Sequence, residues 1–130
     1  MFVDASALVA ILRRESGFEV LVGRLDRAGD SITSPISVLE AVMSLRRHKR
    51  LHVAEAREAV TSLLARSSIE VVVIDEATSD LAIDAHARFG KGSGHPARLN
   101  FGDCFAYAMA KQHGVPLLYK GNDFSQTDLA

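Results

Sequence analysis

The chain has 130 residues, enough for one domain with its own core and too few for two, so residues 1–130 are taken as a single domain. Apolar residues make up 48% of the chain and charged residues 24%, which excludes a disordered polypeptide. The net charge is −1, so a contact with nucleic acid has to come from a local basic patch. One cysteine excludes an internal disulfide, and neither a signal sequence nor a membrane span is indicated, so we expect a cytoplasmic protein.

Four short runs rich in apolar or β-branched residues predict strands, at residues 2–3, 30–33, 70–74 and 116–119. The third run is apolar at each position from Val71 to Ile74, a pattern typical of a parallel strand buried by helices on both faces.

The segments between these runs follow the helical period of apolar residues. They predict helices over residues 5–12, 53–66 and 77–89, one from Phe18 that Gly29 stops and one from Phe101 that Gly114 stops. A further helix begins at Pro35, with Ser34 as its N-cap. Strands that alternate with helices predict a three-layer α/β sandwich around a parallel sheet of four strands, or five if the last residues form a short one. Residues 90–100 are rich in glycine and predict a mobile loop.

Four acidic residues lie where an open α/β sheet places its ligand crevice, beyond the carboxyl ends of the strands. Asp4 follows the first predicted strand, and Asp123 follows the fourth after a short turn. Glu40 and Asp103 lie near the beginnings of two predicted helices. Three of the four also have an ordinary structural interpretation, since Asp4 and Asp103 can cap helices and Asp123 can form a turn. Asp75 also follows a strand, but a helix begins directly after it, which favours a cap.

Glu40 is less easily explained by local structure. Because Ser34 is the predicted cap, Glu40 falls in the second helical turn, too far in to reach the free N–H groups. It borders the apolar stripe between Ile36 and Met43, and a carboxylate there needs a hydrogen-bond partner or a metal ion.

If these four carboxylates converge, two of them about 5 Å apart repel by roughly 3 kcal/mol at an effective dielectric constant of about 20. A divalent cation removes this repulsion, and oxygen ligands without paired His or Cys favour Mg²⁺ or Mn²⁺. Such ions activate water toward phosphates. The pattern therefore predicts metal-dependent phosphodiester cleavage.

The acids lie in four motifs that follow one another along residues 2–124: FVDASAL, SPISVLE, LNFGDCFAYA and LLYKGNDF. Together these motifs resemble the PIN-domain family, and more narrowly the VapC-type ribonuclease toxins of type II toxin–antitoxin pairs. The resemblance implies that the first strand lies near the centre of the sheet and the strand before Asp75 at its edge. It also implies that one pocket binds Mg²⁺ or Mn²⁺ through Asp4, Glu40, Asp103 and Asp123.

Two further residues follow from the resemblance. Ser6 would lie beside Asp4 and orient a ligand or water. In the last motif, many relatives carry Thr-x-Asp-x-Asp-Phe where this chain has Tyr-Lys-Gly-Asn-Asp-Phe, so Gly121 replaces the first aspartate. Either Asp123 or Asn122 therefore completes the acidic site.

Two groups of basic residues are candidates for contact with the RNA backbone. Arg46 and Arg47 begin a run of five basic residues at a helix end, where the ordinary alternative is a solvated end favoured by the helix dipole. Lys91, His95 and Arg98 lie in the loop that leads into the last predicted helix. An open acidic crevice suits single-stranded or loop RNA better than a duplex.

The resemblance also implies a VapB-type antitoxin whose tail covers the helices at residues 5–28 and 35–50, and a homodimer or a larger toxin–antitoxin assembly. Three alternatives remain: an inactive PIN-like binding module, a receiver-like phospho-acceptor domain and a haloacid-dehalogenase-like phosphatase. The first would have lost some of the acids. The second would need an acid adjacent to Asp4, and the third an aspartate at the position of Ser6.

Overall fold

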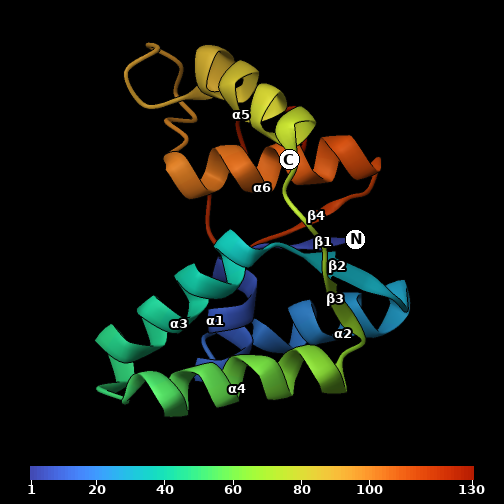
Figure 1. Ribbon diagram of the computed structural model, residues 1–130, viewed down its shortest axis with the longest axis vertical. Helices are drawn as coiled ribbons and strands as arrows, with labels where there is room; N and C mark the ends of the chain where they lie inside the picture. Colours follow the sequence, from blue (N-terminus) through green and yellow to red (C-terminus); the bar gives the residue numbers. More distant parts are fainter.

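The computed structural model describes residues 1–130 as four strands and six helices (Figure 1). In chain order these are β1 (Phe2–Val3), α1 (Ala5–Arg13), α2 (Phe18–Ala28), β2 (Ser31–Thr33), α3 (Pro35–Lys49), α4 (Val53–Arg66), β3 (Ile69–Val71), α5 (Glu76–Phe89), α6 (Phe101–His113) and β4 (Leu117–Leu118). The strands form one parallel sheet in the order β3-β2-β1-β4, and no fifth strand is present. None of the helices has the length and apolar character needed to cross a membrane.

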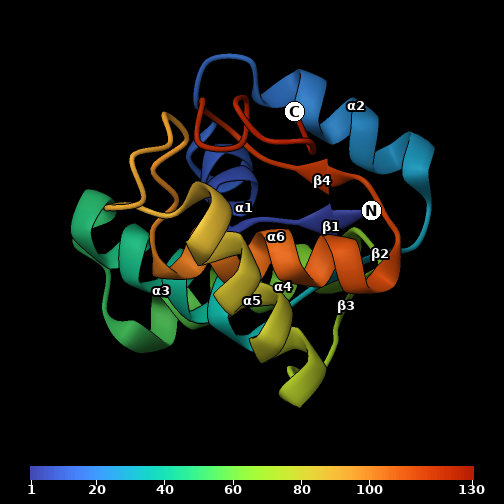
Figure 2. The ribbon, with the colours of Figure 1, turned by 90° about the horizontal axis from the view of Figure 1, so that it is seen from above.

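The sheet is the middle layer of the predicted three-layer α/β sandwich. Helices α1 to α4 lie on one side of it and α5 and α6 on the other (Figures 1 and 2). Because side chains alternate along a strand, adjacent residues enter different cores. Phe2 and Leu117 pack with α5 and α6, whereas Val3 and Leu118 pack with the helices on the other side. All four side chains are buried, so β1 and its neighbour β4 at the sheet edge anchor both layers.

Strand β1 lies inside the sheet, between β2 and β4, as the resemblance implied. Hydrogen bonds from both neighbouring strands fix the carboxyl end of β1. The backbone N–H of Asp4 donates to the carbonyl of Leu118 at 2.9 Å, and the Thr33 hydroxyl donates to the carbonyl of Val3 at 2.8 Å. Asp4 therefore leaves the sheet at a well-defined position.

The prediction of a strand buried on both faces at residues 71–74 is wrong. β3 ends at Val71, which is 44% exposed, and Val73 beyond it is 79% exposed. β3 pairs only with β2 and lies at the sheet edge, as the resemblance implied. Only Val72 and Ile74 reach the core under α5 and α6, so an apolar run marks the chain as strand-like but does not fix its place in a sheet.

The predicted helix caps are present. Ser34 accepts a hydrogen bond from the N–H of Ser37 at 3.1 Å, and Asp75 accepts one from the N–H of Thr78 at 2.9 Å. The loop at residues 90–100 is closed at its base, where the N–H of Leu99 donates to the carbonyl of Phe89 at 2.9 Å. These local contacts set where α3, α5 and α6 begin.

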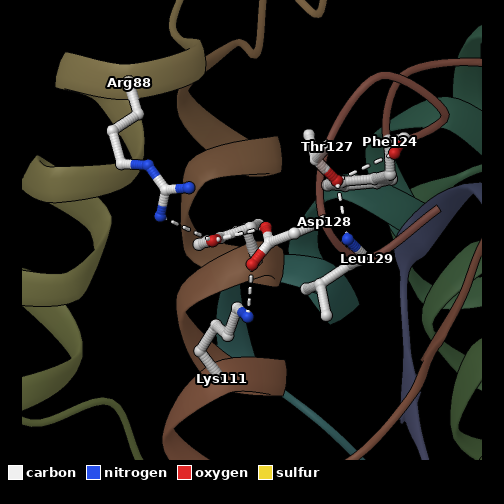
Figure 3. Close-up of polar contacts among 7 residues, drawn as sticks. Arg88, Lys111, Phe124, Thr127, Asp128 and Leu129 are labelled. Carbon is white, nitrogen blue, oxygen red and sulfur yellow. Dashed lines mark hydrogen bonds and ion pairs between the residues drawn. The ribbon is translucent and has the colours of Figure 1, made fainter.

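The segment after β4 is anchored on α6 (Figure 3). Asp128 accepts hydrogen bonds from the Tyr107 hydroxyl at 2.8 Å and from the Lys111 ammonium at 2.5 Å. Phe124 is 1% exposed and packs in the core beneath α6. Asp123 directly precedes the segment that these two residues anchor.

Replacing Asp128 with alanine should lower the free energy of unfolding by about 1 kcal/mol, because the buried Tyr107 hydroxyl loses its acceptor and Lys111 its partner. Urea denaturation at pH 7 measures the change. The exposed Asp26 on α2 provides the control, since Asp26→Ala removes the same charge without a hydrogen bond. Equal unfolding free energies for the two variants would contradict this role of Asp128.

Candidate active site

Asp4 both caps α1 and faces the crevice at the end of the sheet. Its Oδ2 atom accepts hydrogen bonds from the backbone N–H of Ser6 at 3.0 Å and from the Ser6 hydroxyl at 2.5 Å. The Ser6 hydroxyl in turn accepts a bond from the backbone N–H of Lys120 at 3.0 Å. Ser6 thus joins the end of β1 to the chain that follows β4 and orients the Asp4 carboxylate.

Glu40 reaches from α3 to the first turn of α6. A Cβ atom built on Gly102 would lie 2.1 Å from Oε2 of Glu40 and 2.5 Å from its carboxyl carbon. The carboxylate therefore lies directly against the Gly102 backbone, and only glycine leaves room for it. Sequence analysis did not identify this role of Gly102; the signal was a glycine in the first turn of a helix, where it is a poor helix former.

Asp103 follows Gly102 and forms a reciprocal cap with Asn100. The N–H of Asp103 donates to Oδ1 of Asn100 at 2.9 Å, and the N–H of Asn100 donates to Oδ2 of Asp103 at 3.0 Å. The structural and the functional interpretations of Asp103 therefore do not exclude each other. The cap fixes the side chain next to Glu40 at the start of α6.

Each buried aspartate keeps one oxygen atom without a protein partner. In both Asp4 and Asp103 the hydrogen bonds go to Oδ2 and none goes to Oδ1. The one fully buried side-chain oxygen or nitrogen without a partner in the molecule is the hydroxyl of Ser31. The two Oδ1 atoms are therefore open to solvent, where a ligand can reach them.

The four acids lie within one another's electrostatic field. Burial raises the pKa of Asp4, and the charge of Asp123 raises it further. Burial, then the charges of Asp4 and Asp103, raise the pKa of Glu40 to about 7. Burial raises the pKa of Asp103 to about 6, with a smaller contribution from Asp123 and Asp4. The residues predicted from four separate motifs are thus brought together.

The carboxylates of the four acids do not converge on a single ion position. No group of three His, Cys, Asp or Glu side chains in this structure is arranged to hold a metal ion. Asp123 and Asn122 are both exposed at the open side, and the Asn122 side chain makes no hydrogen bond. The donor set consists of oxygen atoms alone, which fits a hard divalent cation.

The predicted RNA-contact residues fall into different places. Arg46 and Arg47 are exposed at the end of α3, and Lys91 and Arg98 are exposed in the loop before α6. His95 serves the loop itself, since its Nδ1 accepts a bond from the N–H of Ala97 at 3.1 Å and its ring packs edge-on against Phe89. No hydrogen bond or ion pair joins these five basic residues to the acids.

Comparison with known proteins identifies the family. The family described as PIN domain matches residues 1–129. The chain belongs to the PIN-domain family. It is 50% identical to a VapC ribonuclease of Rhizobium meliloti, with 98% of each chain covered, and 41% identical to the ribonuclease VapC42 of Mycobacterium tuberculosis, with 99% of this chain and 96% of that one covered.

The fold of this PIN domain has a close match among solved structures. The crystal structure of Mycobacterium tuberculosis VapC20, described as a sarcin–ricin loop cleaving toxin, superposes with a TM-score of 0.71 at 20% identity over 95% of this chain and 92% of that one. The predicted fold and the predicted membership in the VapC-type branch are both confirmed.

The raised pKa values of Glu40 and Asp103 make the stability of this PIN domain depend on pH. The folded state holds protons that the unfolded state releases between pH 4 and 7, so the free energy of unfolding should fall as pH rises through this window. The fall should amount to about 1–2 kcal/mol after allowing for screening by solvent.

Urea denaturation in EDTA at several pH values measures this fall. Glu40→Gln should flatten the upper part of the profile, since the pKa of Glu40, about 7, lies above that of Asp103, about 6. Glu58→Gln on the exposed face of α4 provides the control. A profile of Glu40→Gln that is parallel to the wild type would contradict the assignment.

Proposed function

We propose that this chain is a VapC-type endoribonuclease that hydrolyses RNA phosphodiester bonds at the acidic crevice with the help of Mg²⁺ or Mn²⁺. Ribonuclease activity is the activity named for its relatives over nearly the whole chain. The observation that carries the proposal is the placement of the Glu40 carboxylate on the Gly102 backbone, within the field of Asp4 and Asp103. Packing three acids together costs stability, and a cationic ligand offsets that cost.

The chain's own residues divide the work. Asp4, Glu40, Asp103 and Asp123 would hold the cation, with Asn122 as the alternative fourth ligand. A bound divalent cation stabilises charge on the phosphate and lowers the pKa of a coordinated water. Ser6 and Asn100 hold Oδ2 of the two aspartates, which leaves each Oδ1 without a protein partner and available to a ligand. Single-stranded or loop RNA can place one phosphate there.

A protein partner is part of the proposal. The relatives are VapC ribonucleases, and we propose a cognate VapB-type antitoxin together with a homodimer or a toxin–antitoxin hetero-oligomer. Large apolar side chains exposed near the crevice support such an interface: Leu39 and Met43 on α3 and Phe101 on α6 are 59%, 49% and 73% exposed.

The alternative functions are less well supported. An inactive PIN-like module has no need for the buried acids, which lower stability without a ligand. A receiver-like domain is disfavoured by the family to which the chain belongs and by Asp75, which caps α5. The position that a haloacid-dehalogenase-like phosphatase would use for its general acid is Ser6.

The purified protein should cleave single-stranded RNA in Mg²⁺ or Mn²⁺ and stop when EDTA is added. Asp103→Asn should lower the rate by more than about a hundredfold, because the amide removes a charge from the cation site but preserves the cap on Asn100. Asp84→Asn, on the exposed face of α5, should retain full activity. Cleavage in EDTA, or by Asp103→Asn at the wild-type rate, would overturn the mechanism.

Gly102→Ala tests the position of Glu40. The new methyl group would displace the carboxylate, so RNA cleavage should fall by at least about tenfold. The unfolding free energy should change by less than about 1 kcal/mol, since alanine favours the helix. The matched control is Gly23→Ala in α2, where the nearest atom to the new methyl would be Nη1 of Arg27 at 3.4 Å. Equal cleavage by the two variants would exclude a role for this contact.

A further inference from the structure

A groove of about 400 Å³ leads away from the acidic crevice between α1 and α3. Its beginning is lined by Ser6 and Glu40, which belong to the candidate active site. Its far end is lined by Arg13 on α1 and Arg47 on α3. Each arginine lies seven residues after the site residue on its own helix, which corresponds to about 10 Å along the helix axis. The groove therefore connects the crevice with two cations at a distance that one or two nucleotides can span.

The charged side chains of the groove differ in how far they are free to bind a ligand. Arg13 is paired with Glu15 at 3.0 Å, so these two charges offset each other. The ammonium of Lys120 donates to the backbone carbonyl of Ser16, which keeps a positive charge beside the crevice. Arg47 has no hydrogen bond and no ion pair with any side chain. Arg47 is thus the free cation of the groove.

Arg46 does not line this groove, although it is exposed on the same helix next to Arg47. Consecutive residues of a helix point about 100° apart, so the two neighbouring arginines lie on different faces of α3. Glu40, Met43, Ser44 and Arg47 recur at intervals of three and four residues and form the stripe that faces α1.

We propose that this groove binds the phosphodiester backbone of single-stranded RNA beside the cleaved bond, and that Arg47 contacts one of its phosphates. The proposal rests on the proposed ribonuclease function and extends it by giving the substrate a path. The groove begins where the reacting phosphate has to lie. After the Arg13–Glu15 pair is cancelled, the Glu40 carboxylate remains at the crevice end and belongs to the candidate cation site, and the cations Arg47 and Lys120 remain for the substrate. A polyanion matches this arrangement, and contacts to phosphate are independent of base sequence.

The test compares Arg47→Gln with Arg46→Gln, each in the Asp103→Asn protein, whose predicted slow cleavage leaves the RNA intact while binding is measured. Fluorescence anisotropy with a labelled single-stranded oligoribonucleotide measures the dissociation constant at several salt concentrations. Arg47→Gln should weaken binding by about three- to tenfold and reduce the slope of log K against log salt by about 0.7, the value for one lost phosphate contact on a single strand. Arg46→Gln should change the dissociation constant by less than about twofold.

Two further measurements separate a phosphate contact from other roles. The loss caused by Arg47→Gln should be the same for oligonucleotides of two unrelated sequences. In the protein with all four acids intact, Arg47→Gln should raise KM and leave kcat nearly unchanged, because the contact is made equally in the ground state and the transition state.

Equal losses in Arg46→Gln and Arg47→Gln would overturn the proposal, since a diffuse basic helix end would then explain the binding. Unchanged RNA affinity in Arg47→Gln would also overturn it and leave the groove to a protein segment. These failures are distinct from failure of the proposed function. If the wild-type protein cuts RNA and the two variants bind alike, only the groove is wrong; if it binds RNA through Arg47 but cuts none, only the ribonuclease assignment is wrong.

Discussion

Carboxylates that repel one another lie at the carboxyl end of the sheet, and the stability of the rest of the molecule has to offset this repulsion. Asp4 and Asp103 are buried, and Glu40 is pressed against a helix backbone. None of these positions would be stable in a loosely packed chain. Two hydrophobic cores, one on each face of the sheet, supply the stability that holds the acids in place.

The parallel sheet explains why residues far apart in sequence meet at this end. All four strands end on the same side. β1, β2 and β4 each continue into a helix or turn that carries an acid of the site, and α6 contributes Asp103. Ser6 ties the end of β1 to the chain after β4, and Asn100 fixes Asp103 at the start of α6. Asp4 and Asp103 are both candidate ligands and parts of helix caps, so at these two residues local folding and the site depend on the same hydrogen bonds.

Local chemistry explains which features the sequence could predict. The caps at Ser34, Asp75 and Asn100 depend on residues within one helical turn, and all three are present. The burial of Val73 depends on which strand lies at the edge, and this order follows from the packing of the whole chain. The apolar run at residues 71–74 alone therefore predicted burial for Val73, which is exposed.

The site shows the same division. The convergence of the acids followed from their motifs, but the contact between Glu40 and Gly102 required the relative position of α3 and α6. The distinction between Arg46 and Arg47 required both the rotation of α3 and the presence of α1 beside it. Sequence patterns identified the basic residues at the end of α3, and tertiary packing determines that Arg47 and not Arg46 lines the groove.

The pairing of β1 with β4 has a consequence for synthesis of the protein. The first strand of the chain gains one of its two neighbours only when Leu117 and Leu118 are available, and Asp123 follows them. Contacts of such long sequence separation form slowly, because closing a long loop costs conformational entropy. A growing chain that still lacks these residues has an unpaired flank on β1 and an incomplete set of acids, so the candidate site can be assembled only when nearly the whole chain has been synthesised.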